Sequence, residues 1–246
     1  MSLKERENAI LGILSENGQA TVEELCRRLF VSQPTVRRDL SALSERGLIV
    51  RTHGGARARN AAGQNLPQEI REREHAAAKE IIGRKCLALV RDGDTVMADG
   101  SSTALSLVRL LGERKNILLV TNSAKAPIIL ADTGVKVFVT GGELAPNTYA
   151  YVGSTAEEMM RRFCADVCFF SVRTLTETGE LTDNAIAEND VRRVMLSRSR
   201  RRVLMLDSEK IGTPCASTLG TLADVTDAVS EKEIGERFPM YKGLFR

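Results

Sequence analysis

The sequence lacks the features that would send a chain into a membrane or out of the cell. Its 246 residues contain no run of about 18 apolar residues, and the first ten, MSLKERENAI, have no apolar signal core. Five cysteines are scattered without a CxxC pair, which favours buried thiols over disulfides. We therefore expect no membrane partner and a cytoplasmic location.

Metal and nucleotide signatures are missing as well. The only histidines are His53 and His75, so a metal site is not expected. GxGxxG and Walker patterns are absent, which disfavours a bound dinucleotide or ATP, and no cofactor is expected. Hydrophobic residues at 43% and charged residues at 27% are ordinary globular values. The length allows a small domain plus a medium-sized one.

Positive charge is concentrated near the N-terminus. Residues 1–59 hold ten Lys/Arg and seven Asp/Glu, whereas the rest of the chain holds 25 of each, so the net charge of +3 belongs to this segment alone. A phosphate backbone is the natural partner of such a segment. Charge by itself would equally fit a solvated basic face.

Three short helices are predicted within the first 45 residues. The apolar spacing predicts one over residues 4–16, and Thr21 with Glu24 forms a capping-box pattern that begins the second. Ser32 is a favourable N-cap for the third, which we expect over residues 32–44. The face of this third helix opposite its apolar residues carries side chains suited to phosphates and base edges: Ser32, Gln33, Thr35, Arg37, Arg38 and Ser41.

A basic hairpin is predicted to follow. Residues 48–50 are typical of a strand, His53-Gly54-Gly55 of a tight turn, and the chain from Ala56 of a returning strand. Such a wing would bring Arg51, Thr52, His53 and Arg57 to backbone phosphates or the minor groove. Two helices, a polar third helix and a basic hairpin together favour binding to double-stranded DNA.

The stretch TVEELCRRLFVSQPTVRRDLSALSERGLIVRTHGGA resembles the N-terminal signature of DeoR-family transcriptional regulators, which reads VSxxTVRRDLxxLxxxGLIxRxHGGA. The resemblance implies a winged helix-turn-helix domain over residues 1–59, with residues 32–44 as the recognition helix. It further implies a repressor of a sugar or polyol operon that binds its operator as a homodimer or homotetramer.

Residues 60–70 lack apolar periodicity and are predicted to be a linker. From residue 71 to 246 we expect a larger α/β domain that begins with a helix over residues 71–90. Helical patterns then alternate with short apolar runs, which favours a mainly parallel sheet covered on both faces. The expected strands are 95–98, 117–120, 136–140, 166–170, 202–206 and one near residue 228, and the expected helices are 102–111, 124–132, 154–163 and 185–199.

Small polar residues follow three of these strands. Residues 99–103 (DGSST), 121–123 (TNS) and 140–142 (TGG) each come directly after a strand. Ligands of open α/β sheets bind at the carboxyl edge of the strands, where helix N-termini offer N–H groups to anions. Three such loops favour a phosphorylated small ligand, although Ser or Thr before a helix is often only an N-cap.

Residues from about 75 to 230 resemble the effector domain of the same family, which is itself similar to ribose-5-phosphate isomerase and glucosamine-6-phosphate deaminase. The matching motifs are DGDT, ADGSSTA, VTNS, VTGGEL and DSEKIG. The resemblance implies that Asp99, Gly100, Ser101, Ser102 and Thr103 form the phosphate loop. It implies further that Asn122, Gly141 and Gly142 line the site and that Lys210 offers a cation to the effector.

One segment departs from the family pattern. Relatives tend to read FLGxDGI after the fourth strand, whereas this chain reads FFSVRTL and has Arg173 at the acidic position. Arg173 either grips a second anionic or hydroxyl-rich group of the effector, or points to solvent or pairs with Glu177. A guanidinium cannot act as a general base, since it stays protonated at any working pH.

Three hypotheses of function compete at this point. The first is a non-enzymatic, effector-controlled regulator, which accounts for both halves of the chain. The second is a sugar-phosphate isomerase-like or deaminase-like enzyme with an accessory DNA-binding domain, which would require a positioned base. The third is an architectural DNA-binding protein without a ligand, in which the three polar loops would have no use. We favour the regulator.

Overall fold

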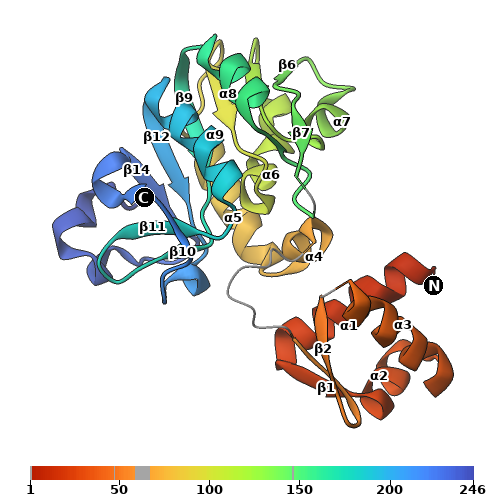
Figure 1. Cartoon of the computed structure of the whole chain (residues 1–246). Coiled ribbons are helices and arrows are strands. Elements are labelled where there is room, and N and C mark those ends of the chain that lie inside the picture. Colours follow the sequence, from red (N-terminus) through yellow and green to blue (C-terminus); the bar gives the residue numbers. More distant parts are fainter. Residues whose placement is uncertain (1, 47, 59–66, 146) are drawn as a thin grey trace. The chain divides into compact units, whose positions relative to one another are not determined.

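The computed structural model describes residues 2–46, 48–58, 67–145 and 147–246 (Figure 1). Its contacts divide the chain into two compact units, residues 1–74 and residues 75–246. Each unit has its own hydrophobic core, and we describe each by itself.

The first unit is a winged helix-turn-helix. A three-stranded antiparallel sheet in the order β1-β3-β2 packs with three helices, and a short fourth helix follows. The elements are α1 (Leu3–Asn17), β1 (Gln19–Thr21), α2 (Val22–Leu29), α3 (Gln33–Glu45), β2 (Ile49–Thr52), β3 (Gly55–Ala58) and α4 (Gln68–Arg73). The helices and the hairpin confirm the fold expected from the sequence, whereas β1 was not predicted.

Local signals explain where the helices of this unit begin and how the hairpin fits. The Thr21 hydroxyl accepts a hydrogen bond from the backbone N–H of Glu24, which is one half of the predicted capping box, while the Glu24 carboxylate pairs with Arg28 instead. Ser32 occupies the N-cap position of α3 but makes no capping bond, because its hydroxyl pairs with that of Thr35 at 3.0 Å. Gly55 must be glycine, since a Cβ there would lie 2.0 Å from the carbonyl oxygen of Ala20 on β1.

The expected linker and the helix after it need correction. Residues 60–66 lie outside the described residues, but residues 68–70 of the expected linker are helical. The helix expected over residues 71–90 is two helices, α4 and α5 (Ala76–Leu87), interrupted at His75, whose φ is +51°. Helix α4 belongs to the first unit, because Ile70 is buried in the core of that unit.

The second unit is an α/β domain built on a six-stranded parallel sheet. The strand order is β14-β12-β9-β4-β5-β6, and every neighbouring pair is parallel. The strands are β4 (Thr95–Ala98), β5 (Leu118–Thr121), β6 (Lys136–Val139), β9 (Ala165–Phe170), β12 (Ser199–Met205) and β14 (Asp227–Val229). This sheet confirms the parallel α/β fold that the alternating pattern predicted.

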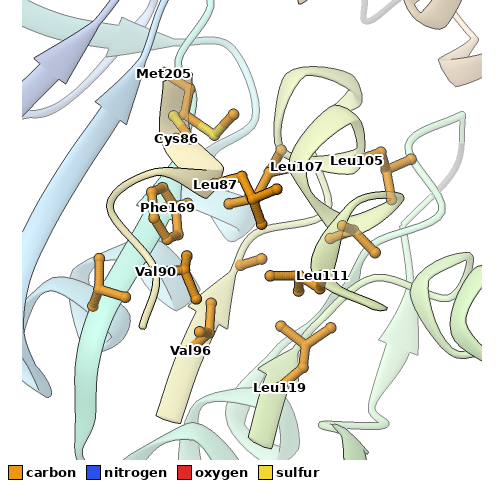
Figure 2. Packing of buried hydrophobic residues seen from close by; sticks show 14 of the residues in the cluster. Cys86, Leu87, Val90, Val96, Leu105, Leu107, Leu111, Leu119, Phe169 and Met205 are labelled. Carbon is orange, nitrogen blue, oxygen red and sulfur yellow. The ribbon is translucent and has the colours of Figure 1, made fainter. Parts of the chain in front are cut away.

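Helices cover both faces of the sheet. One core cluster joins the sheet to α5, α6 (Ser102–Val108) and α7 (Ala126–Leu130), and Figure 2 shows Leu87, Leu105 and Leu111 packing there with Val96 and Phe169 of the strands. The other cluster joins the opposite face to α8 (Ser154–Arg161) and α9 (Ile186–Ser197). The strands are therefore buried on both faces, which explains their apolar, β-branched sequences.

Smaller elements lie beyond the ends of the main strands. Strands β7 (Glu143–Leu144) and β8 (Tyr151–Val152) form a hairpin, and β10 (Thr174–Leu175), β11 (Glu180–Asp183) and β13 (Ser217–Thr221) form a second, antiparallel sheet. Short 3₁₀ turns complete the unit: η1 (Leu111–Glu113), η2 (Ser208–Lys210), η3 (Leu222–Asp224), η4 (Gly235–Arg237) and η5 (Pro239–Leu244).

The cysteines meet the expectation of buried thiols only in part. All five are free; Cys86 and Cys168 are buried, but Cys164 is exposed. Burial raises the pKa of Cys168 to about 12, so this thiol stays protonated near neutral pH. None of the helices in the described part of the chain is both long and apolar enough to span a membrane.

Candidate functional site

The polar face of α3 is open to solvent. The side chains predicted to contact DNA from this helix are exposed except Thr35, which is half-buried: Ser32, Gln33, Arg37, Arg38 and Ser41. At the tip of the β2–β3 wing, Thr52 and His53 are exposed as well. The helix thus presents two guanidinium groups together with amide and hydroxyl groups, which are the chemistry of phosphate and base-edge contacts.

Ion pairs with α1 hold α3 on the side opposite its exposed face. Both carboxylate oxygens of Asp39, which is 1% exposed, accept hydrogen bonds from the guanidinium of Arg6. Arg46, just after α3, pairs with Glu7 at 2.7 Å. A bidentate pair fixes orientation as well as distance, so α1 sets the angle at which α3 is presented.

Arg51 of the wing reaches back to α3. Its Nη1 donates to the backbone carbonyl of Arg37 and to the Ser41 hydroxyl, each at 3.1 Å. Ser41 in turn donates to the same carbonyl at 3.0 Å. Arg51 was predicted to contact DNA, and here its guanidinium joins the wing to the middle of the helix.

In the second unit, the loops expected to form the effector site gather at the carboxyl edge of the parallel sheet. The chain runs outward from β4 through β5 to β6, then crosses back to β9, β12 and β14 on the other side of β4. The topology therefore reverses between β4 and β9. Open α/β sheets bind their ligands at such a switch point.

The loop of residues 99–103 lies at this switch point. The Ser101 hydroxyl caps α6 by accepting from the N–H of Ala104 at 3.1 Å, and the N–H of Ser101 donates to Asp99 Oδ1 at 3.2 Å. The N–H groups of Ser102 and Thr103 donate to no acceptor in the described part of the chain. Two backbone donors are thus free to meet an anion.

Lys210 joins this loop to the end of β9. Its Nζ donates to the Thr103 hydroxyl at 3.2 Å and to the Ser171 hydroxyl at 2.9 Å, and Asp207 Oδ2 lies 3.7 Å from it. Asp207 is 2% exposed, and its Oδ1 has no hydrogen-bond partner among the described residues. An ammonium group, two hydroxyls and a carboxylate therefore meet beside the two free N–H groups.

Asp99 faces the interior rather than this cluster. Its Oδ2 accepts from Arg192 Nε at 2.8 Å, and Arg192 also binds Asp183 and Glu188 at 3.0 and 3.1 Å. Burial alone lowers the pKa of Arg192, but the charges of the three carboxylates outweigh it and raise that pKa. Asp99 thus supports the loop from the interior. Gly100 allows Ala150 to pack against the loop, because a Cβ on Gly100 would lie 2.8 Å from the Cβ of Ala150.

The remaining expected residues are spread along the same edge. Asn122, after β5, is 2% exposed and donates through Nδ2 to the Tyr151 carbonyl at 3.0 Å. Gly141 and Gly142, after β6, have φ of +64° and +108°, and Gly142 backs closely onto the carbonyl of Val152. Arg173, two residues after Ser171, is half-buried and makes no hydrogen bond or ion pair with the described residues. Glu177, considered as its partner, pairs with Arg237 instead.

Two polar residues of this cluster were missed by the sequence reasoning. Ser171 entered only as part of the segment FFSVRTL, and Asp207 only as part of the motif DSEKIG. A signal was present, because each follows the end of a main strand in the same way as the loops that were singled out. Among the described residues, no group of three or more His, Cys, Asp or Glu side chains could hold a metal ion.

Comparisons with known proteins agree over most of the chain. The family model described as the DeoR C terminal sensor domain matches residues 74–232, and the DeoR-like helix-turn-helix domain matches residues 6–61. The transcriptional regulator GolR of Listeria innocua is 31% identical over 94% of this chain and 92% of its own length. The repressor CsqR of Escherichia coli is 32% identical over 90% of this chain and 85% of its own length. The L-fucose operon activator of the same organism is 30% identical over 92% of this chain and 94% of its own length.

A solved structure of ribose-5-phosphate isomerase from Methanocaldococcus jannaschii is also similar, at 16% identity and a TM-score of 0.42 over 55% of this chain and 53% of that one. This likeness is too distant to carry an argument about activity. The two family matches, together with the winged helix-turn-helix and the parallel α/β unit, decide the identity. The chain belongs to the DeoR family of DNA-binding transcriptional regulators.

Proposed function

We propose that this regulator is a repressor of a sugar or polyol operon and that its sensor domain binds a phosphorylated sugar or polyol. The observation that carries the effector chemistry is the position of Lys210 Nζ between the hydroxyls of Thr103 and Ser171. A cation, two hydroxyls and the free N–H groups of Ser102 and Thr103 offer a phosphate several donors at the topological switch point.

The charge around Lys210 favours a role for Arg173. Asp207, 3.7 Å from Lys210, offsets much of the lysine charge, so a phosphate dianion would gain little from that pair alone. Arg173 follows Ser171 by two residues and has no partner among the described residues. We infer that its guanidinium turns to the same edge and supplies the missing positive charge, and that it prefers effectors with a second anionic or hydroxyl-rich group.

Binding without turnover is part of the proposal. The buried carboxylate of the phosphate loop, Asp99, already accepts from Arg192, Ser101 and Ser171, and is therefore a poor general base. The family's acidic position holds Arg173, which cannot accept a proton. Isomerase and deaminase assays with phosphorylated sugars should accordingly give no product. Turnover that a substitution of Asp207 abolishes would favour the enzymatic alternative instead.

The DNA half of the proposal rests on the exposed polar face of α3 and on the wing tied to it by Arg51. A single winged helix touches too few base pairs for tight operator binding, so we expect a homodimer or homotetramer on repeated half-sites. The relatives that match this chain include both a repressor, CsqR, and an activator, the L-fucose operon protein. The experiment must therefore measure whether the effector releases DNA or strengthens its binding.

The test begins with a duplex selected from a random library by the full-length protein. A thermal-shift screen of phosphorylated sugars and polyols then identifies compounds that raise Tm, and each is added to the protein–DNA complex. Release of the duplex supports a repressor controlled by a phosphorylated effector. Binding strengthened by the compound would overturn that direction of control, and a screen in which no phosphorylated compound binds would overturn the effector class.

Two variants locate the effector within the sensor domain. If the phosphate lies between Lys210 and residues 101–103 and Arg173 grips the ligand, both Lys210→Met and Arg173→Ala lower the affinity measured by titration. Loss of affinity in Lys210→Met alone keeps the phosphate site and removes the role given to Arg173. No loss in either variant would overturn the assignment of the site.

A further inference from the structure

Three buried polar side chains near the carboxyl ends of β5 and β6 are left without hydrogen bonds. Asn122 Oδ1, Thr140 Oγ1 and Thr148 Oγ1 have no partner among the described residues, although these side chains are only 2%, 6% and 2% exposed. A buried oxygen without a partner costs free energy, so each one needs an explanation. Three of them in adjoining segments indicate a place kept for a ligand.

The backbone places Asn122 and Thr140 on neighbouring strands, and Thr148 on a segment that pairs with the chain after Asn122. Thr121 pairs with Val139 in the sheet, so Asn122 and Thr140 follow at the same level of neighbouring strands, and the N–H of Thr140 donates to the Thr121 carbonyl. The segment of residues 147–150, which we call the strap, runs along the chain after β5. Ala150 of the strap bridges to Ser123, and the Tyr149 carbonyl accepts from the N–H of Ala124 at 2.8 Å.

The strap also covers the phosphate loop. The Cβ of Ala150 would lie 2.8 Å from a Cβ on Gly100, and Asn122 Oδ1 would lie 3.7 Å from it. The unpaired oxygen of Asn122 therefore faces the loop that also bears the donors of the proposed phosphate site. In the strap, Asn147 and Tyr149 have φ of +65° and +50°, a conformation that is uncommon for residues other than glycine and unfavourable for a bulky tyrosine.

We propose that Asn122, Thr140 and the strap residue Thr148 form a subsite for the hydroxyl groups of the effector. The inference rests on the proposed function, which puts the phosphate beside Lys210. Asn122 Oδ1 can only accept, so the ligand must present a hydroxyl donor to it, whereas the threonines can donate or accept. The subsite carries no charge, and it therefore suits the neutral end of a sugar or polyol phosphate.

The sheet sets how far apart the two ends of the site lie. Lys210 binds Ser171 at the end of β9, whereas Asn122 follows β5, two strands away across β4. Neighbouring strands lie about 4.8 Å apart, so the two ends of the site are separated by roughly 10 Å. Because a hydrogen bond of about 2.8 Å at each end covers part of that distance, a phosphate on a chain of about three or more carbons can reach both ends.

The test compares probes with and without hydroxyls on the full-length protein. Ribitol 5-phosphate and sorbitol 6-phosphate carry the hydroxyls, ethyl phosphate has the phosphate alone, and sorbitol has the hydroxyls alone. The variants are Thr140→Val and Thr148→Val, which remove one hydroxyl each at nearly constant volume. Thr226→Val is the matched control, because the Thr226 hydroxyl donates to the Arg202 carbonyl before β14, at the opposite edge of the sheet.

We expect the tighter-binding polyol phosphate to lose about three- to tenfold in affinity in each site variant, while ethyl phosphate binding is unchanged. Tm without ligand should stay the same or rise in both, because an unpaired buried hydroxyl is removed. The control variant Thr226→Val should instead have a lower Tm and unchanged affinities for both phosphates. A residue with a merely structural role would not lower affinity while leaving stability intact.

Wild-type protein that binds polyol phosphates no more tightly than ethyl phosphate would overturn the inference. Site variants that lose affinity for both probes equally, or that lose stability as the control does, would overturn it too. A different result would show that only the proposed phosphate site is wrong. In that case ethyl phosphate does not bind, but sorbitol binds and Thr140→Val lowers its affinity. If no probe binds at all, both the subsite and the proposed effector class are wrong.

Discussion

Replacing Arg192 on α9 should strongly destabilise the sensor domain. The side chain is 3% exposed and donates to Asp99, Asp183 and Glu188, all of which are buried. Arg192→Leu leaves three carboxylates without their cation in one buried cluster. Removing one partner of a buried ion pair costs about 3–5 kcal/mol, because the remaining charges cannot be hydrated.

For a unit of this size, each kcal/mol lowers Tm by about 2–4 °C, so the expected loss is roughly 6–20 °C. Calorimetry on the full-length chain suits the measurement, since two units need not unfold together. Arg193→Leu is the matched control. Arg193 is the next residue on the same helix, but its side chain is 46% exposed and its pair with Asp190 is exposed too, so the change should cost less than about 1 kcal/mol.

Arg192→Lys separates charge from geometry. A lysine keeps the positive charge but cannot bind three carboxylates from one planar group, so an intermediate loss is expected. If Arg192→Leu is no less stable than Arg193→Leu, the cluster does not hold the domain together. The view of Asp99 as the buried support of the phosphate loop would then be wrong as well.

Three further predictions concern DNA, assembly and pH. Arg38→Ala should weaken specific duplex binding, measured by fluorescence anisotropy, by about 1–3 kcal/mol while Tm is unchanged. Arg200→Ala, in the other unit, should have no effect on duplex binding. If Arg38→Ala leaves affinity and salt dependence unchanged, Arg38 does not contact the DNA. Light scattering should give a dimer or tetramer at micromolar concentration, and a monomer with and without DNA would contradict this. Burial raises the pKa of Asp227, but hydrogen bonds from Thr226 and Arg246 and the charge of Arg201 outweigh it and hold that pKa below its ordinary value. Asp227→Asn should therefore lower the free energy of unfolding in urea by roughly 1 kcal/mol at pH 7. The difference should begin to shrink at about pH 4 and vanish as pH falls through the lowered pKa, and a difference that persists in stronger acid would refute this.

Elements with strong local signals could be predicted from the sequence. Helix α3 has apolar residues on one face and a proline in its first turn, and each parallel strand of the main sheet is a short apolar run. Strand β1 has three residues and exists because β3 pairs with it, and β10 has only two. Such strands depend on partners that are distant in the sequence, and no periodicity can reveal them.

The boundary between the units illustrates the same limit. Helix α4 has six residues and one buried apolar side chain, Ile70, which gives no helical period to detect. What fixes it is tertiary, because Ile70 fills the core beneath α1. Tertiary burial outweighs weak local preference in such short segments.

The candidate effector site shows which part of a site a strand–loop pattern can predict. The pattern named the loops after β4, β5 and β6 because the carboxyl ends of parallel strands must meet at one edge. It could not decide which side chains of a loop face outward. In the loop after β4, Asp99 turns to Arg192 while Ser102 and Thr103 keep free N–H groups, and that division depends on a helix more than eighty residues away.

This division within the loop bears on how an effector could act. A loop whose first residue is held by Arg192, and whose Ser101 caps α6, has little freedom to move when a ligand binds. The strap of residues 147–150 is attached differently, by backbone hydrogen bonds and the packing of Ala150 on Gly100, and it contains two residues with positive φ. A ligand can shift an equilibrium only where its contacts differ between two arrangements. Thr148 of the strap has a hydroxyl that is unpaired among the described residues and that a ligand could bind, so we expect an effector to change the position of the strap rather than that of the phosphate loop.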